Sequence, residues 1–117
     1  MAINFGPLSD QAGFLGACVV DSSTGMVLAI EGGGRIDLEL AAAGNTEVVR
    51  AKLRTMKSLG LGDTIEDILI TLTKQYHIIR PVQAKPGIFI YLVLDKARAN
   101  LAMARRACQD TENSLTF

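Results

Sequence analysis

The chain has 117 residues, and its 12 lysines and arginines equal its 12 aspartates and glutamates, so the formal net charge is zero. This balance argues against a nucleic-acid-binding protein, which needs a basic surface to displace counterions from phosphates. Hydrophobic residues make up 49% of the chain and charged residues 21%, a large apolar content for one small domain. We therefore expect a single domain with an extensive core, or with some apolar surface buried against a partner.

The sequence has no feature of a membrane or secreted protein. No window approaches the roughly 18 apolar residues of a membrane span, and residues 1–13 lack the basic residues and apolar core of a signal peptide. Cys18 falls in a predicted strand and Cys108 in a predicted helix, which favours two buried thiols over a disulfide. We expect a cytoplasmic protein without nucleic-acid or membrane partners.

The first predicted element is a strand–turn–strand unit, ACVVDSSTGMVLAIEG at residues 17–32. The apolar runs Phe14–Val20 and Met26–Ile30 flank the turn Asp21–Gly25. The glycines Gly32–Gly34 follow and permit a sharp change of direction. They precede a predicted helix, where an anion can bind, but no lysine or G-x-G-x-x-G pattern accompanies them, so a mobile loop is the simpler interpretation.

A long helix is predicted over about Leu38–Leu59, with Asp37 as its N-cap and Gly60 at its end. Gly44 could instead interrupt this segment and leave a second, shorter helix after it. The continuous helix is favoured because both of its flanks keep their phase across Gly44.

This helix has three different faces at 100° per residue. The broad apolar stripe expected to pack on the sheet consists of Leu38, Ala41, Ala42, Asn45, Val49, Leu53, Met56 and Leu59. The opposite face is polar and includes Thr46, and its Glu47 and Arg50 are spaced to form an ion pair. A second, weakly apolar flank consists of Leu40, Gly44, Val48, Ala51 and Thr55. A helix packed on one sheet needs only the first stripe, so the second flank suits the close approach of another helix.

Three further strands are predicted. The segment Glu66–Thr73 alternates between its two faces. One of these faces carries Ile68, Ile70 and Leu72. The next strand, Tyr76–Val82, contains Pro81, which has no N–H group and so marks the strand end or an unpaired position. The last strand, Ile88–Leu94, is apolar throughout and belongs in the middle of a sheet covered on both sides.

A final helix is predicted after Asp95, which would cap it. Its apolar stripe consists of Ala97, Leu101, Ala104 and Cys108. The polar residues from Gln109 onward are expected to fray.

The predicted order is therefore ββαβββα, an α+β fold. Short connections make the five-stranded sheet antiparallel, with the long helix on one face and the C-terminal helix on the other. We expect a short N-terminal extension at 1–13, a single domain at 14–110, and a polar C-terminal tail at 111–117.

Residues typical of catalysis or metal binding form no recognisable pattern. His77 is the only histidine and has no cysteine or acidic residue at ligand spacing, so a strand residue with a hydrogen bond is the simpler interpretation. Asp63, Glu66 and Asp67 are interpreted as a loop and a solvated strand face rather than an acid–base pair. Gly60–Gly62 follows a helix, whereas a dinucleotide-binding fingerprint precedes one. We predict no catalytic, cofactor-binding or metal site.

Residues 14–110 resemble the roadblock/dynein light chain family in its bacterial form. Three segments carry the resemblance: ACVVDSSTGMVLAIEG, DLELAAAGNTEVVRAKL and IIRPVQAKPGIFIYLVLDKARANLAMARR. The resemblance implies a profilin-like or longin-like sheet and a homodimer in which the long helix and the third strand meet their counterparts. It also implies a non-catalytic protein-interaction module that binds or regulates a small Ras-like GTPase, or an adaptor in a motor complex.

The resemblance places the dimer interface on Leu40, Gly44, Val48, Ala51, Thr55, Ile68, Ile70 and Leu72. Pairing would also protect an apolar edge strand that is otherwise an aggregation hazard. Many family members carry a helix before the first strand; here that helix is missing or one turn long. The sequence does not distinguish which arginine would reach into the active site of a GTPase, and the candidates are Arg35, Arg50, Arg80, Arg98 and Arg105.

Three functional hypotheses follow. The leading one is a homodimeric regulator or scaffold for a small GTPase, and the second is a structural adaptor in a larger assembly. The third is a small-molecule sensor, for which His77, Tyr76 and Arg80 are the candidate convergent polar groups. Dependence of binding on GTP separates the first two hypotheses.

Overall fold

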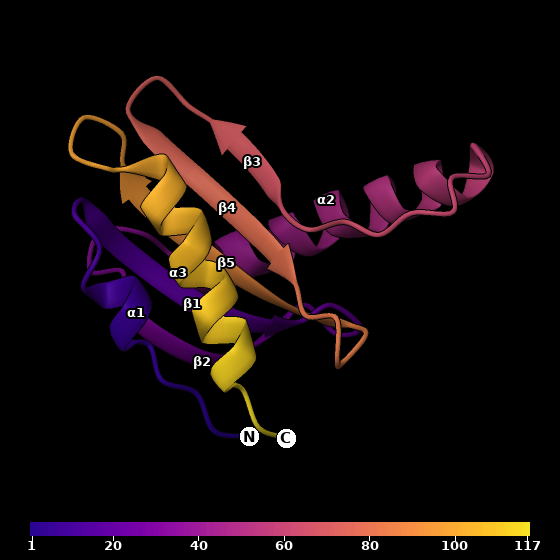
Figure 1. Ribbon diagram of the computed structural model, residues 1–117, viewed down its shortest axis with the longest axis horizontal. Helices are drawn as coiled ribbons and strands as arrows, with labels where there is room; N and C mark the ends of the chain where they lie inside the picture. Colours follow the sequence, from indigo (N-terminus) through magenta and orange to yellow (C-terminus); the bar gives the residue numbers. More distant parts are fainter.

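The computed structural model describes residues 1–117 and confirms the predicted α+β architecture (Figure 1). In chain order the elements are α1 (Gly6–Ser9), β1 (Phe14–Asp21), β2 (Met26–Gly32), α2 (Leu38–Ser58), β3 (Ile68–Thr71), β4 (Gln75–Pro81), β5 (Ile88–Asp95) and α3 (Leu101–Ser114).

The five strands form one antiparallel sheet of order β2-β1-β5-β4-β3. Strand β5 is central, as its unbroken apolar sequence predicts. In the register of its two neighbours, Val19 of β1 lies opposite Ile90, and Ile79 of β4 lies opposite Tyr91. Pro81 ends β4, as expected for a residue without an N–H group. Strands β2 and β3 are the two edges.

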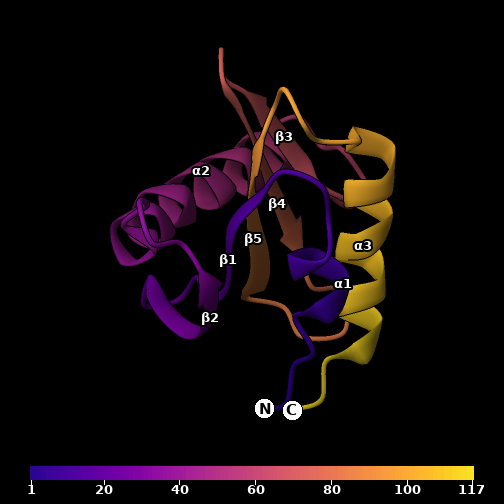
Figure 2. The same ribbon diagram turned by 90° about the vertical axis from the view of Figure 1, so that its left-hand side faces the viewer.

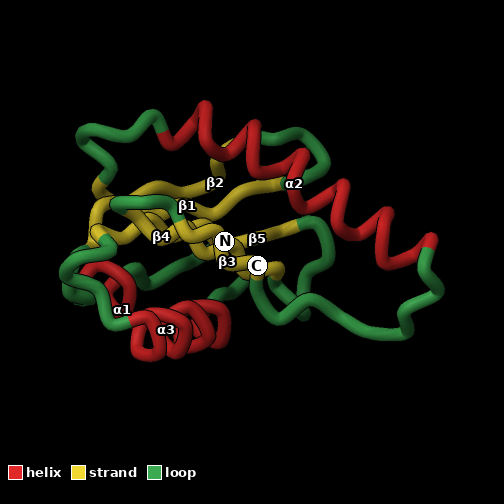
Figure 3. The backbone as a smooth tube through the Cα atoms, turned by 90° about the horizontal axis from the view of Figure 1, so that it is seen from above, coloured by secondary structure: helices red, strands yellow, loops and turns green.

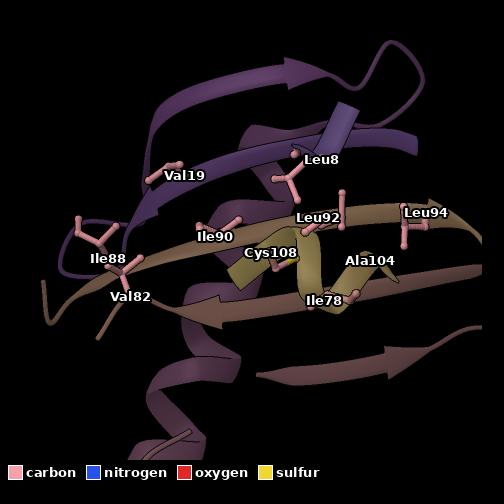
Figure 4. Close-up of a cluster of buried hydrophobic side chains, with 12 residues drawn as sticks. Leu8, Val19, Ile78, Val82, Ile88, Ile90, Leu92, Leu94, Ala104 and Cys108 are labelled. Carbon is pink, nitrogen blue, oxygen red and sulfur yellow. The ribbon is translucent and has the colours of Figure 1, made fainter. Parts of the chain in front are cut away.

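The sheet separates two hydrophobic clusters, with α2 on one face and α3 together with α1 on the other (Figures 2 and 3). Alternate residues of β5 supply both clusters: Ile88, Ile90, Leu92 and Leu94 face α3 (Figure 4), and Phe89, Tyr91 and Val93 face α2. Each of these side chains is almost fully buried, which contributes about 1.5–3 kcal/mol per large apolar residue. The two-sided burial confirms the interpretation of β5 from its sequence.

Helix α2 begins at its predicted cap and is continuous through Gly44. The Asp37 carboxylate accepts a hydrogen bond from the Leu40 backbone N–H at 3.0 Å. Gly60 adopts φ +67° just after the helix, a conformation that glycine permits. The predicted Glu47–Arg50 pair forms at 3.4 Å.

Two residues assigned to the buried stripe of α2 are in fact exposed. Leu53 and Leu59 lie on the C-terminal half of the helix, which projects beyond the sheet (Figures 1 and 3). Periodicity predicts which side of a helix is apolar but not where the sheet beneath it ends. Conversely, Thr46 is buried, although its position predicted a polar face, and its hydroxyl is satisfied by donating to the Ala42 carbonyl at 2.8 Å.

The start of α3 differs from the prediction. Asp95 ends β5 and accepts a hydrogen bond from the Ala97 N–H at 3.2 Å, so it caps a turn rather than the helix. The N-cap is Asn100, whose side chain accepts from the Met103 N–H at 3.1 Å. Both residue types can cap a helix, and the sequence does not distinguish between them.

The C-terminal segment does not fray at Gln109, and that expectation is wrong. Helix α3 continues to Ser114, Thr111 is fully buried, and Thr116 forms a β-bridge with Ala2. The short helix α1 has a single turn, in agreement with the sequence, and its Leu8 is fully buried in the α3-side cluster.

Candidate interaction surface

The outward side of α2 carries exposed apolar residues, as expected for the second flank. We call this surface the α2 flank and define it as Leu40, Gly44, Val48, Ala51 and Thr55, all of which are exposed. Leu40 is 70% exposed, and a Cβ atom added to Gly44 would meet no atom within 4 Å. The flank is therefore open in the single chain.

The projecting half of α2 adds further apolar surface that the sequence analysis did not assign to an interface. Leu53, Leu59 and Leu61 are exposed on this half and on the segment that follows it, with Leu59 at 65%. Such a concentration of large aliphatic side chains on a small domain is typical of a surface that another protein covers. The only sequence signal was the apolar stripe itself, which predicts burial without identifying what covers it.

A groove runs between α2 and the chain that leads into β3. It has a volume of about 480 Å³, and its apolar lining includes Val48 of the α2 flank and Ile68 of β3. Lys52 lies on the helix side of the groove, and Asp63 and Glu66 on the opposite side. The groove therefore makes the α2 flank and the β3 edge one continuous surface.

Strand β3 is shorter than predicted. It covers four residues instead of Glu66–Thr73, and Leu72 lies in the turn, where its N–H donates to the Gln75 carbonyl at 2.9 Å. Ile68 and Ile70 are half-buried beside the α2-side cluster, and Leu72 is exposed. The eight residues predicted for the interface thus lie on one helix face and on the adjoining sheet edge.

The acidic residues near β3 do not form the solvated face that was expected. Asp67 is largely buried and receives two hydrogen bonds from Arg105 of α3, Nε–Oδ2 at 2.7 Å and Nη2–Oδ1 at 3.2 Å. This bidentate pair raises the pKa of Arg105 and holds the entry to β3 against α3. Asp63 and Glu66 remain exposed.

His77 is a hydrogen-bonded strand residue, as interpreted from the sequence. Its Nδ1 atom lies 2.8 Å from the Tyr91 hydroxyl, and its Nε2 atom lies 2.8 Å from Oε1 of Gln75. Because an amide oxygen only accepts, we assign the ring proton to Nε2, and Tyr91 then donates to Nδ1. Partial burial lowers the pKa of His77, and burial raises that of Tyr91 to about 12.

The three groups proposed for a sensor pocket do not converge, and that expectation is wrong. Adjacent strand residues point to opposite faces, so His77 lies on the α2 side, whereas Tyr76 packs against the α3-side cluster. Arg80 is paired with Glu112 of α3. No cleft is lined by any of the three.

The five candidate arginines are no longer equivalent. Arg80 forms an ion pair with Glu112 of α3, and Arg105 forms one with Asp67. Arg50 pairs with Glu47 and donates to the Ser23 carbonyl at 3.0 Å. Arg35 and Arg98 form no ion pair and are exposed. Of the five arginines, these two are the ones whose guanidinium groups are open to a partner protein.

The two cysteines are buried thiols on opposite faces of the sheet, which confirms their interpretation as small core residues. Cys18 belongs to the α2-side cluster and Cys108 to the α3-side cluster. Burial raises the pKa of each to about 12, which makes both thiols poor nucleophiles. None of the three helices combines the length and hydrophobicity that a membrane crossing requires.

An antiparallel five-stranded sheet with α2 on one face and α3 on the other defines an α+β domain of the profilin-like or longin-like class. Within this class the chain has the fold of the roadblock domain. The resemblance inferred from the sequence is confirmed at the level of the fold.

Solved structures of bacterial proteins share this fold. The roadblock/LC7 domain from Streptomyces avermitilis matches with a TM-score of 0.80 and 13% identity, over 93% of this chain and 88% of its own. Myxococcus xanthus MglB matches with a TM-score of 0.78 and 17% identity, over 91% and 83%. MglC from the same organism gives 0.59 and 18%, over 92% and 88%. No protein-family model and no curated protein matches the sequence.

Proposed function

We propose that this chain is a non-catalytic homodimeric interaction module that binds a small Ras-like GTPase. The observation that carries the proposal is the open apolar surface formed by the α2 flank, the projecting half of α2 and the β3 edge. The roadblock fold and the likeness to MglB, one structure of which is described as having a tetrameric arrangement, support self-association.

The shape and composition of this surface support a dimer. The small residues Gly44 and Ala51 let a second helix approach closely, while Leu40 and Val48 supply apolar contact area at its margins. A two-fold axis near Val48 places α2 against its counterpart, because a symmetric interface uses the same patch on both subunits. The contact covers the helix side chains that the single chain leaves exposed.

The β3 edge extends the same contact. Its four residues leave unpaired backbone groups on the outer side, and pairing with the β3 strand of a second copy satisfies them. The half-buried Ile68 and Ile70 then become covered by the partner helix. The two sheets join into one, which leaves β2 as the edge on either side.

The GTPase part of the proposal comes from the roadblock resemblance. The relative from Thermus thermophilus is described as a gliding protein, and this chain matches it with a TM-score of 0.74 at 17% identity. A dimer of this fold presents a broad surface, and such a surface can distinguish the nucleotide states of a partner by shape and charge. The expected action is therefore binding or regulation rather than chemistry by this chain.

The experiment is a pull-down of the tagged protein from lysate of the organism that encodes it, run with a non-hydrolysable GTP analogue and with GDP. The proposal predicts a small GTPase enriched in one nucleotide state. Equal recovery of large structural proteins in both states favours an adaptor instead and contradicts the GTPase assignment. Arg98→Gln and Asp110→Asn each remove one exposed charge, of opposite sign. Comparing the GTPase recovered by the two variants tests whether Arg98 lies at the contact.

A further inference from the structure

A second cleft lies at one end of the sheet, away from the interaction surface. It has a volume of about 460 Å³ and is formed where β1 and β4 begin and where β2 and β5 end. This is the end of the sheet at which the β3–β4 turn and the β5–α3 connection lie (Figure 1). The cleft shares no residue with the α2 flank or with β3.

Two cations without ion-pair partners line this cleft. Arg35, in the connection from β2 to α2, and Lys74, in the β3–β4 turn, form no ion pair with any carboxylate of the chain. The one acidic residue in the lining, Asp95, already accepts a hydrogen bond from the Ala97 N–H. The ionisable lining therefore has a net charge of one positive unit, in a chain whose total is zero.

The lining also has an apolar part. Phe14 and Leu15 from the start of β1, together with Ile36, supply it. A concave site with an apolar wall and a few polar groups is the usual composition of a small-molecule site, and its volume lies in the usual range.

Backbone hydrogen bonds hold the segments that carry these side chains. The Gly33 N–H donates to the Leu15 carbonyl at 2.9 Å, and the Lys96 N–H donates to the Lys74 carbonyl at 3.0 Å. The glycine loop is therefore anchored to β1, whereas the sequence suggested a mobile loop. Binding therefore does not carry the entropic cost of ordering these backbone segments.

We propose that this cleft binds a small organic monocarboxylate with an apolar body. The carboxylate interacts with the Arg35 guanidinium and the Lys74 ammonium, and the body packs on Phe14, Leu15 and Ile36. Inorganic phosphate can pair with the same two cations but has no apolar body to pack on these three side chains. The first turn of α2 is not the binding element, because Asp37 already caps it.

The test follows backbone amide shifts of the ¹⁵N-labelled protein by NMR at low ionic strength, with benzoate as the probe. Benzoate should shift the amides of Gly34, Ile36 and Gln75. Benzamide lacks the charge, and acetate and inorganic phosphate lack the apolar body, so each should bind more weakly than benzoate.

Arg35→Gln should weaken benzoate binding about tenfold, the usual effect of losing one charge-assisted hydrogen bond. Lys85→Gln, which removes an exposed cation in the β4–β5 turn outside every cleft, should leave the affinity unchanged. An unchanged amide spectrum outside the cleft shows that each variant is folded. Equal binding of benzoate and benzamide, equal affinity in the two variants, or no shifts at about 20 mM benzoate overturns the proposal, because that concentration exceeds the dissociation constant of even a weak specific site.

Discussion

Arg80 of β4 donates a hydrogen bond from Nε to Oε1 of Glu112 on α3, with 2.5 Å between the two atoms. The other carboxylate oxygen of Glu112 accepts from the Gln83 backbone N–H at 2.7 Å. The Arg80 and Glu112 side chains are only 14% and 10% exposed. One carboxylate thus links the end of α3 to the end of β4, which explains why the chain after Gln109 remains helical.

Replacing Glu112 with alanine should leave the Arg80 guanidinium without its partner in a largely buried site. We expect the free energy of unfolding to fall by about 3 kcal/mol, as for other buried pairs broken on one side. Asp110→Ala is the matched control, because it removes the exposed pair with Arg106 and should cost less than about 1 kcal/mol. Urea unfolding of both variants measures the difference, and equal losses would show that the Arg80–Glu112 pair is not a structural link.

Replacement by alanine should destabilise the protein at one of two neighbouring glycines before α2 and not at the other. At Gly33, φ is +86° and an added Cβ would lie 2.5 Å from Cδ1 of Leu38, whereas at Gly34 it would meet nothing within 4 Å. Gly33→Ala should destabilise the protein by about 1–3 kcal/mol through backbone strain and crowding. Gly34→Ala should change the stability by less than about 0.5 kcal/mol. Thermal unfolding tests this order, and a Gly34 variant as unstable as the Gly33 variant would refute the explanation.

Stability should fall as the pH is lowered through the range in which histidine titrates. The pKa of His77 is lowered in the folded protein by partial burial, so the unfolded chain binds its proton more readily. The contribution of neutral His77 is complete above the unfolded pKa of 6.5 and is lost as the pH falls below it. Denaturant midpoints measured from pH 7.5 to 5 should therefore decline in the wild type, and His77→Gln should flatten the profile over this interval. An unchanged slope in the variant would assign the pH dependence to other groups.

Gly44→Leu should weaken self-association without unfolding the single chain. The space beside Gly44 is empty in the monomer, so a larger side chain meets only the second copy. Gly44→Ala serves as the control, because it should raise helix stability by about 1 kcal/mol and crowd the contact far less. Sedimentation equilibrium gives the dissociation constant of each variant. If leucine leaves this constant unchanged, Gly44 does not lie in the helix–helix contact.

Local sequence signals predicted most of the fold because each depends on neighbouring residues. The apolar sequence of β5, the cap at Asp37, and the strand end at Pro81 all agree with the structure. The order of elements then leaves few antiparallel arrangements with one helix on each face.

The errors arose where a residue's environment depends on distant segments. Leu53 and Leu59 are exposed because the sheet does not extend beneath them. The Asp67 side chain is largely covered where it pairs with Arg105, 38 residues away. The α2 flank is exposed, as its phase on the helix predicted, whereas Leu72 lies in a turn rather than in the predicted strand. Sequence periodicity could not reveal the groove between α2 and β3, nor the cleft at the end of the sheet. Both are formed in part by loops, which have no periodic pattern.

The central claim is that the open surface of α2 and β3 is a homodimer interface. The most direct test is to measure the mass of the purified protein in solution by multi-angle light scattering at micromolar concentration. The account predicts a mass of twice the 12.5 kDa chain. A mass equal to a single chain at that concentration would contradict it.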